Sequence, residues 1–174
     1  MKKMAKAVVL AVMILGELAA MAQISIPGTG FSFRLNGDDW SFVRNYKLKD
    51  GADIYLYCYT REVLIDAEGD TALPFLRIYV NTAYEGDVYE LAYERFEQQP
   101  FQSIDEYTSG PGLPKSGGLG YVGAYTNPND EKDYEFLMTY FQDKKGIVEF
   151  RLETSLDTFD DMEFEFRDIL SSIK

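Results

Sequence analysis

The strongest constraint on the fold of this chain is an alternation of apolar and other residues over much of its first two-thirds, as in Phe31-Ser32-Phe33. A period of two is typical of β-strands, because successive side chains point to opposite faces of a sheet. Turn signals such as Asn36-Gly37 separate the alternating segments. We therefore predict strands over 31–35, 40–46, 54–59 and 75–80.

Two segments show helical spacing instead. Asp87 and Glu90 form a capping-box-like start, and Pro100 lies just past the end of that helix. Near the C-terminus, a cap at Asp157 or Thr158 is followed by an apolar stripe. Further strands are predicted over 119–126, 134–141 and 147–154, the last two as a hairpin. Two helices with about six to seven mainly antiparallel strands predict an α+β domain.

The last thirty residues resemble the ending of PsbP-like proteins. A hairpin strand over 146–154 leads into Phe159 and then into a helix that finishes Phe166-Arg167-Asp168-Ile169-Leu170-Ser171-Ser172. Phe31-Ser32-Phe33 followed by Trp40 is similar to the family's first strand and tryptophan, and 87–98 matches the place of its middle helix. The resemblance runs from about Phe31 to Lys174. It implies an α/β/α sandwich, in which helices flank an antiparallel sheet.

PsbP-like proteins serve mostly as non-catalytic accessory or binding modules, among them a photosystem II subunit, a Ran-binding import factor and bacterial envelope proteins. The matching residues here are packing residues, so the resemblance implies no site residue and no cofactor. What it implies is an accessory module whose ligand the sequence does not name.

Residues 1–22 are expected to be a cleaved secretory signal peptide. A basic start with three lysines precedes nine apolar residues over 7–15, and Ala20-Met21-Ala22 supplies small residues before Gln23. A spanning helix needs about 20 apolar residues, so a membrane anchor is disfavoured, as is a buried N-terminal helix. Cleavage between Ala22 and Gln23 would leave a single domain over 23–174, periplasmic or secreted. This start resembles exported proteins of Bacteroidota-type Gram-negative bacteria.

The net charge, the absence of histidine and the single cysteine limit the partners and the reactions that this chain can have. Without residues 1–22 the chain carries 14 basic and 28 acidic residues, a net charge of −14 that makes nucleic acid a poor partner. The sequence has no histidine, so serine and cysteine nucleophiles lack their usual base and histidine-containing zinc sites cannot form. Cys58 is the only cysteine, and its alternation with Ile54 and Leu56 predicts an inert buried thiol.

One acidic segment has the spacing of calcium ligands. Asp66, Glu68 and Asp70 stand at alternate positions, as the first ligands of an EF-hand loop do. Such a loop needs glycine at its sixth position and glutamate at its twelfth, where this chain has Thr71 and Arg77. A solvated acidic turn is favoured, and low-affinity Ca²⁺ binding is the alternative.

The segment 109–118, rich in glycine and proline, superficially resembles a phosphate loop through Lys115-Ser116. A phosphate loop needs glycine directly before that lysine and a helix directly after it, whereas Pro114 and a strand stand there. A mobile surface loop is therefore predicted, and partner recognition through this loop, with Lys115 on its surface, is the alternative.

Paired carboxylates are the other candidates for catalysis. Glu149 and Glu153 alternate with Arg151 along one strand, which predicts an exposed ladder of ion pairs. Glycoside hydrolysis would instead require two carboxyl groups that face each other across a cleft.

Tyr55, Tyr57 and Tyr59 share the face of their strand that Ile54, Leu56 and Cys58 do not occupy. Amphipathic core is the favoured interpretation of these rings, with Tyr134 and Tyr140 joining them from another strand. The alternative is an exposed aromatic platform for a glycan or a protein partner.

The function predicted from sequence is an exported, non-enzymatic accessory or binding module, first of all for protein interaction with an envelope partner. A histidine-free, carboxylate-based glycan hydrolase and a glycan-binding domain are the alternatives. No cofactor, no nucleic-acid partner and no membrane span after cleavage are expected.

Overall fold

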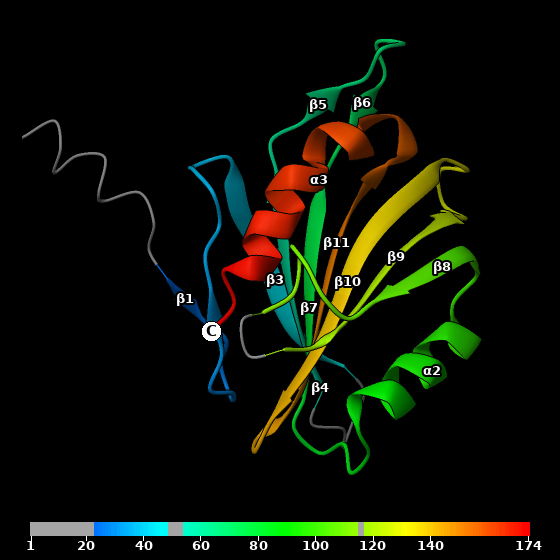
Figure 1. Ribbon diagram of the computed structural model, residues 1–174. Helices are drawn as coiled ribbons and strands as arrows, with labels where there is room; N and C mark the ends of the chain where they lie inside the picture. Colours follow the sequence, from blue (N-terminus) through cyan, green and yellow to red (C-terminus); the bar gives the residue numbers. More distant parts are fainter. Residues whose placement is uncertain (1–22, 49–53, 115–116) are drawn as a thin grey trace, which may run out of the picture.

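The computed structural model describes residues 23–48, 54–114 and 117–174, so the expected signal peptide lies outside the described residues. Its centre is a seven-stranded antiparallel sheet in the order β3-β4-β7-β11-β10-β9-β8 (Figure 1). The strands are β3 Trp40–Leu48, β4 Ile54–Arg61, β7 Phe75–Asn81, β8 Phe101–Tyr107, β9 Leu119–Thr126, β10 Asp133–Asp143 and β11 Gly146–Ser155. With helices α2 (Val88–Gln98) and α3 (Leu156–Ser171), this sheet confirms the predicted α+β class.

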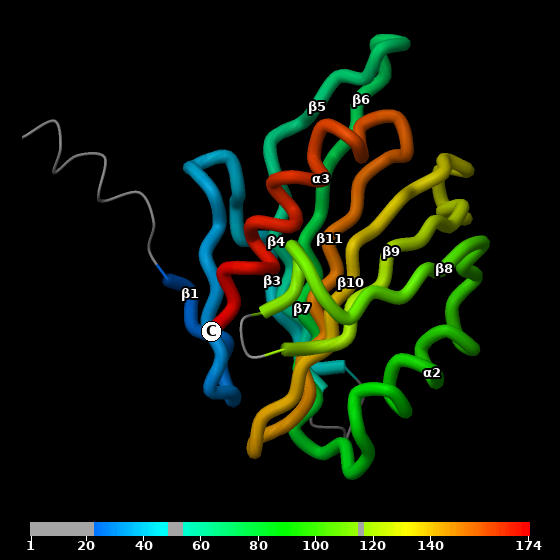
Figure 2. Tube along the Cα trace, in the orientation of Figure 1, coloured from blue at the N-terminus to red at the C-terminus, as the bar shows by residue number. Residues whose placement is uncertain are grey.

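Among the described residues, four short strands lie outside this sheet. β1 (Ile24–Ser25) pairs with β2 (Ser32–Phe33), and β5 (Leu64–Ile65) pairs with β6 (Thr71–Ala72). Figure 2 shows the C-terminus beside the β1–β2 segment, where the backbones of Ser32 and Lys174 exchange two hydrogen bonds. The two boundaries of the PsbP-like resemblance, near Phe31 and at Lys174, therefore lie side by side in the fold.

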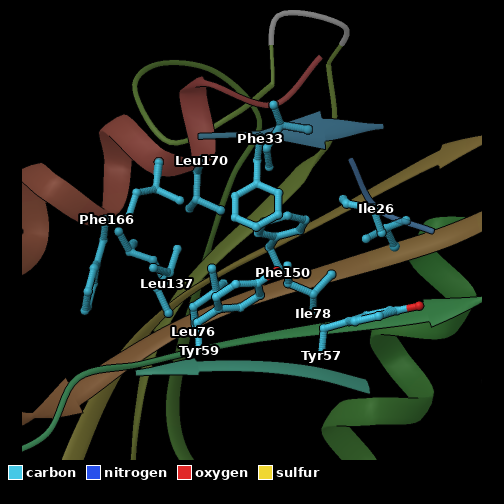
Figure 3. Packing of buried hydrophobic residues seen from close by; sticks show 14 of the residues in the cluster. Ile26, Phe33, Tyr57, Tyr59, Leu76, Ile78, Leu137, Phe150, Phe166 and Leu170 are labelled. Atoms are coloured by element: carbon cyan, nitrogen blue, oxygen red, sulfur yellow. The ribbon is translucent and has the colours of Figure 1, made fainter. Parts of the chain in front are cut away.

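The larger core lies between α3 and one face of the sheet. Phe150 of β11 is fully buried there and meets the rings of Phe33 and Phe141 at 5.1 and 5.5 Å. Figure 3 shows Phe166 and Leu170 of α3 directed onto the same cluster. The apolar stripe predicted for the C-terminal helix is the surface that α3 buries.

A second, smaller core lies on the opposite face of the sheet, where α2 covers strands β8 to β10 (Figure 1). Ala92 of α2 is fully buried beside Tyr121, Met138 and Tyr140. Both sheet faces of the central strands are therefore buried. Tyr134 and Tyr140 belong to this face, so the prediction that they join Tyr55, Tyr57 and Tyr59 was wrong: β10 presents its even-numbered residues away from α3.

The sequence prediction was correct for the start of α2 and wrong for the start of α3. The capping box of α2 is present, because Asp87 accepts hydrogen bonds from the amides of Tyr89 and Glu90 while the Glu90 carboxylate accepts one from the Asp87 amide. The cap predicted for α3 at Asp157 or Thr158 was wrong. Ser155, the last residue of β11, takes that position, and the Thr158 hydroxyl bonds the Ser155 carbonyl within the first turn.

Trp40 ties the edge strand β3 to α3. Its indole Nε1 donates a hydrogen bond of 2.6 Å to Oε1 of Glu165, and Arg61 of β4 also contacts that carboxylate. A buried tryptophan whose polar atom is satisfied in this way stabilises the packing of helix on sheet.

Candidate functional site

A row of charged residues on β11 is buried rather than exposed. Glu149, Arg151 and Glu153 are 3%, 5% and 0% exposed, which corrects the prediction of a solvent-exposed ladder. The covering groups are aromatic: the Arg151 guanidinium lies 4.9 Å from the ring centre of Tyr125 and 5.0 Å from that of Phe136. Strand β10 supplies the ring of Phe136, and strand β9 supplies the ring of Tyr125.

Each buried carboxylate of this row is paired with arginine. Glu153 contacts Arg151 at 2.7 Å and also pairs with Arg77 of β7. Glu149 contacts Arg95 of α2 at 3.1 Å. Because an unpaired buried charge costs several kcal/mol, these contacts make the row a structural element that fixes α2 against the sheet.

The paired state of Glu149 and Glu153 also bears on catalysis. A carboxylate-based glycosidase needs two carboxyl groups about 5 to 10 Å apart across a cleft. These two lie four residues apart on one strand, about 13 Å at the usual rise per residue, and both face arginine. This pair does not have the geometry of a hydrolytic site.

The outer side of α2 forms an aromatic groove with a volume of about 530 Å³. Tyr89 and Tyr93 are 56% and 65% exposed, although large aromatic side chains usually lie inside a domain. Phe96 packs edge-on against Tyr121 with 4.6 Å between ring centres. The groove is lined by Tyr89, Glu90, Tyr93, Phe96, Glu106 and Tyr121.

Local structure explains why these residues meet. Tyr89, Tyr93 and Phe96 follow one another at spacings of four and three, which places them on one side of a helix. Glu106 of β8 and Tyr121 of β9 are directly opposite each other in the strand register. The sequence analysis identified this helix from its cap and its end and so missed the site; the spacing of Tyr89 and Tyr93 was the available signal.

The groove has an acidic rim. Burial, followed by the charges of Glu106 and Tyr89, raises the pKa of Tyr121 to about 12. Burial and the nearby Glu94 likewise raise the pKa of Tyr84 at the other side of α2. Arg95, a cation on the same helix, is engaged with Glu149. The groove therefore combines aromatic faces with negative potential.

The raised tyrosine pKa values predict a loss of stability in alkali. The pKa of both Tyr121 and Tyr134 is raised from 10.0 to about 12, by burial first and then by neighbouring carboxylates. Because the folded state favours the neutral phenol, this stability is fully present below pH 10 and is lost as the pH rises towards 12. Phenolate absorbance should rise at higher pH in native than in urea-unfolded protein, and Tyr121→Phe should reduce the late component. Coincident titrations in both states would contradict this prediction.

Tyr55, Tyr57 and Tyr59 face α3. Tyr57 and Tyr59 are each 9% exposed, and Tyr55 is half-buried against the same core. Figure 3 shows Tyr57 and Tyr59 directed into that cluster. These rings lie where the core interpretation places them, whereas Tyr89 and Tyr93 on α2 are exposed.

The acidic turn is occupied by contacts within the chain. Asp66 accepts hydrogen bonds from the amides of Glu68 and Asp70 between β5 and β6, and Asp70 pairs with Lys132 at 3.2 Å. Among the residues that the structure describes, no group of three or more acidic or cysteine side chains is arranged to hold a metal ion.

The described part of the 109–118 loop contacts α3 and the sheet, while its mobility stays a prediction. The Gly112 amide donates to Ser171 Oγ at 3.0 Å, and Arg167 donates to the Pro111 carbonyl at 2.9 Å. Leu113 is buried. Lys115 lies outside the described residues.

Two further predicted residues can be located. Cys58 is half-buried rather than buried, because its side of β4 is the sheet face that α2 leaves open. Gln23, expected just after the cleavage point, donates a hydrogen bond to Ser32 at 2.8 Å, while Ala22 lies outside the described residues. In the described parts of the chain no helix is long and apolar enough to cross a membrane.

Comparison with solved structures identifies the fold. The solution structure of cyanobacterial PsbP (CyanoP) from Synechocystis sp. PCC 6803 matches with a TM-score of 0.53 and 14% identity, over 90% of this chain and 92% of that one. The crystal structure of LpqN, involved in cell envelope biogenesis of Mycobacterium tuberculosis, matches with a TM-score of 0.51 and 13% identity, over 88% and 89%. No protein-family model and no curated protein matches by sequence. The predicted PsbP-like fold is confirmed.

Proposed function

We propose that this chain is an exported, non-enzymatic binding module that docks a basic segment of an envelope protein in the aromatic groove of α2. The exposed pair Tyr89 and Tyr93 is the observation that carries this proposal. The domain is residues 23–174, an α/β/α sandwich with one incompletely covered face. LpqN has the same fold and is involved in cell envelope biogenesis, which agrees with an envelope role.

Interface physics supports a protein partner. Tyrosine is enriched in protein–protein interfaces, since a rigid ring buries a large area at a small cost in conformational entropy. Phe96 and Tyr121 form the floor of the groove beneath the two exposed rings. Residues placed in this way are typical of binding hot spots, which have aromatic anchors around a desolvated centre.

Charge supports a basic partner. Glu90 and Glu106 lie in the groove, and the chain from residue 23 onward carries a net charge of −14. Lysine and arginine side chains bind both carboxylates and the faces of tyrosine rings. The acidic surface would also accelerate the approach of a basic segment at low salt.

The groove can be tested with a labelled oligoarginine peptide in fluorescence anisotropy. Replacing both Tyr89 and Tyr93 by serine should weaken binding at least about tenfold, the effect of losing roughly 1.4 kcal/mol at a hot spot. Binding to the unaltered protein should weaken as salt is raised. Phe164→Ser is the matched control, because this ring on α3 is 84% exposed and far from the groove residues in sequence.

Two results would count against a basic partner. Equal binding by the double variant and the control would remove the groove from the site. Salt-independent binding of a neutral oligosaccharide, abolished by the same double variant, would assign the groove to glycan recognition, in which sugar rings stack on the tyrosines.

Export has its own test. Protein recovered from the periplasm or the medium should begin at Gln23, as measured by intact mass and N-terminal sequencing. Replacing Ala20 and Ala22 by bulky residues should leave the precursor uncleaved. A full-length chain that remains in the cytoplasm would overturn the export proposal without affecting the groove.

A further inference from the structure

A second cavity lies on the same sheet face as α2, over the strands that the helix does not cover. In the strand register, Arg44 of β3 is opposite Cys58 of β4, and Cys58 is opposite Arg77 of β7. Neighbouring strands are about 4.8 Å apart, so the two arginines stand on either side of one small side chain. This order of large, small and large side chains leaves a hollow above Cys58.

The hollow has the size and lining of a small-molecule site. Its volume is about 340 Å³, near the lower end of the range of about 300 to 1,000 Å³ that is usual for ligand pockets. The walls combine two guanidinium groups with aromatic and aliphatic surface. They are formed by Val43, Arg44, Tyr46, Leu56, Cys58, Phe75, Arg77 and Tyr79.

The charge of this cavity is opposite to that of the whole protein. Arg77 and Arg151 both pair with the single carboxylate of Glu153, which leaves one positive charge in excess. Arg44 lies over the ring of Tyr46 at 5.3 Å, and within the described ranges no ion pair joins it to a carboxylate. A local excess of positive charge in a protein of net charge −12 favours an anion at this position.

We propose that this cavity binds an organic carboxylate, whose anionic head lies between Arg44 and Arg77 and whose apolar body packs on Leu56 and Phe75. The planar guanidinium fork matches a carboxylate with two parallel hydrogen bonds. A small inorganic anion would gain nothing from the apolar wall beside it, so a ligand with an apolar body is favoured. The site is independent of the aromatic groove, which is acidic and lies on α2.

Cys58 provides a direct reporter, since it is the only cysteine of the chain and lies in the cavity. The probe is 3-phenylpropionate, with its neutral amide and inorganic phosphate as comparisons. Saturating 3-phenylpropionate should slow the labelling of Cys58 by N-ethylmaleimide, whereas the amide and phosphate should not. Cys58→Ser should show no labelling, which confirms the site of reaction.

Two variants separate binding from stability. Arg44→Gln should raise the carboxylate concentration needed for half-protection by about tenfold or more, as expected when a charge-assisted contact is lost. Lys47→Gln is the matched control: it removes a positive charge from the same strand, but Lys47 lies over the ring of Tyr55 on the α3 side. Circular dichroism and urea unfolding of both variants check that the fold is retained.

The outcomes are decisive in either direction. Equal protection by acid and amide, unchanged protection in Arg44→Gln, or no protection by any probe would overturn the proposal. Protection by the acid that Arg44→Gln weakens and Lys47→Gln leaves unchanged would support it. A peptide with a free C-terminus, compared with its amidated form, then shows whether the carboxylate of a chain end binds as well as a free acid.

Discussion

Replacing Glu153 by alanine should lower the free energy of unfolding by about 3–5 kcal/mol, the usual cost of breaking a buried ion pair. Glu153 is fully buried, and it is the shared partner of Arg77 and Arg151. The variant would leave two guanidinium groups without their counter-charge, one of them under the rings of Tyr125 and Phe136. Urea unfolding followed by circular dichroism measures the loss.

The matched control for this variant is Glu163→Ala. Glu163 pairs with Arg167 at 2.7 Å on the surface of α3, where an exposed pair contributes less than about 1 kcal/mol. Replacing Glu153, Arg77 and Arg151 together by apolar residues should cost less than Glu153→Ala alone, because no charge is then left buried. Equal losses for Glu153→Ala and Glu163→Ala would refute the assignment of a structural role to the buried row.

Replacing Phe150 by alanine should destabilise the protein by a similar amount, about 3–5 kcal/mol. The Phe150 side chain is fully buried and lies within 5.5 Å of the rings of Phe33 and Phe141, measured between ring centres. Replacing Phe150 by alanine loses the hydrophobic transfer energy of the ring and leaves a cavity between α3 and the sheet. The packed elements around that cavity are too rigid to close it.

Phe164→Ala is the control of identical chemistry. Phe164 is 84% exposed on α3, and alanine is the better helix former, so the free energy of unfolding should change by no more than about 0.5 kcal/mol. Urea midpoints of the two variants decide the prediction, which would be wrong if Phe150→Ala also fell within that range.

Much of the fold could be predicted from local pattern. The capping box at Asp87 and Glu90 involves residues that are three apart in the sequence, so it depends only on the local start of the helix. The β10–β11 hairpin likewise depends on neighbouring strands and a short turn. The PsbP-like resemblance extended these local elements to the fold that the comparisons confirm.

The faces of the strands could not be predicted in the same way. On β4, Tyr57 and Tyr59 point to one side of the sheet and Leu56 and Cys58 to the other. The alternation in the sequence shows that the two sets lie on different faces, but it does not show which face is covered. Leu56 is nevertheless buried, as are Tyr57 and Tyr59 on the α3 side of the strand. How far each face is covered depends on where α2 ends, and this leaves Cys58 half-buried in an open cavity.

The candidate sites could not be predicted from the sequence, because their residues come together only when the helices pack on the sheet. Arg95 and Glu149 are 54 residues apart, and only the docking of α2 on the sheet makes them an ion pair. The aromatic groove likewise needs α2 and the β8–β9 pair side by side. The periods of the strands and helices and the capping box of α2 follow from residues close together along the chain, and the net charge follows from composition, so these features could be predicted without the structure. Which side chains are buried, paired or exposed could be seen only in the folded protein, because burial and ion pairing depend on neighbours that packing brings together.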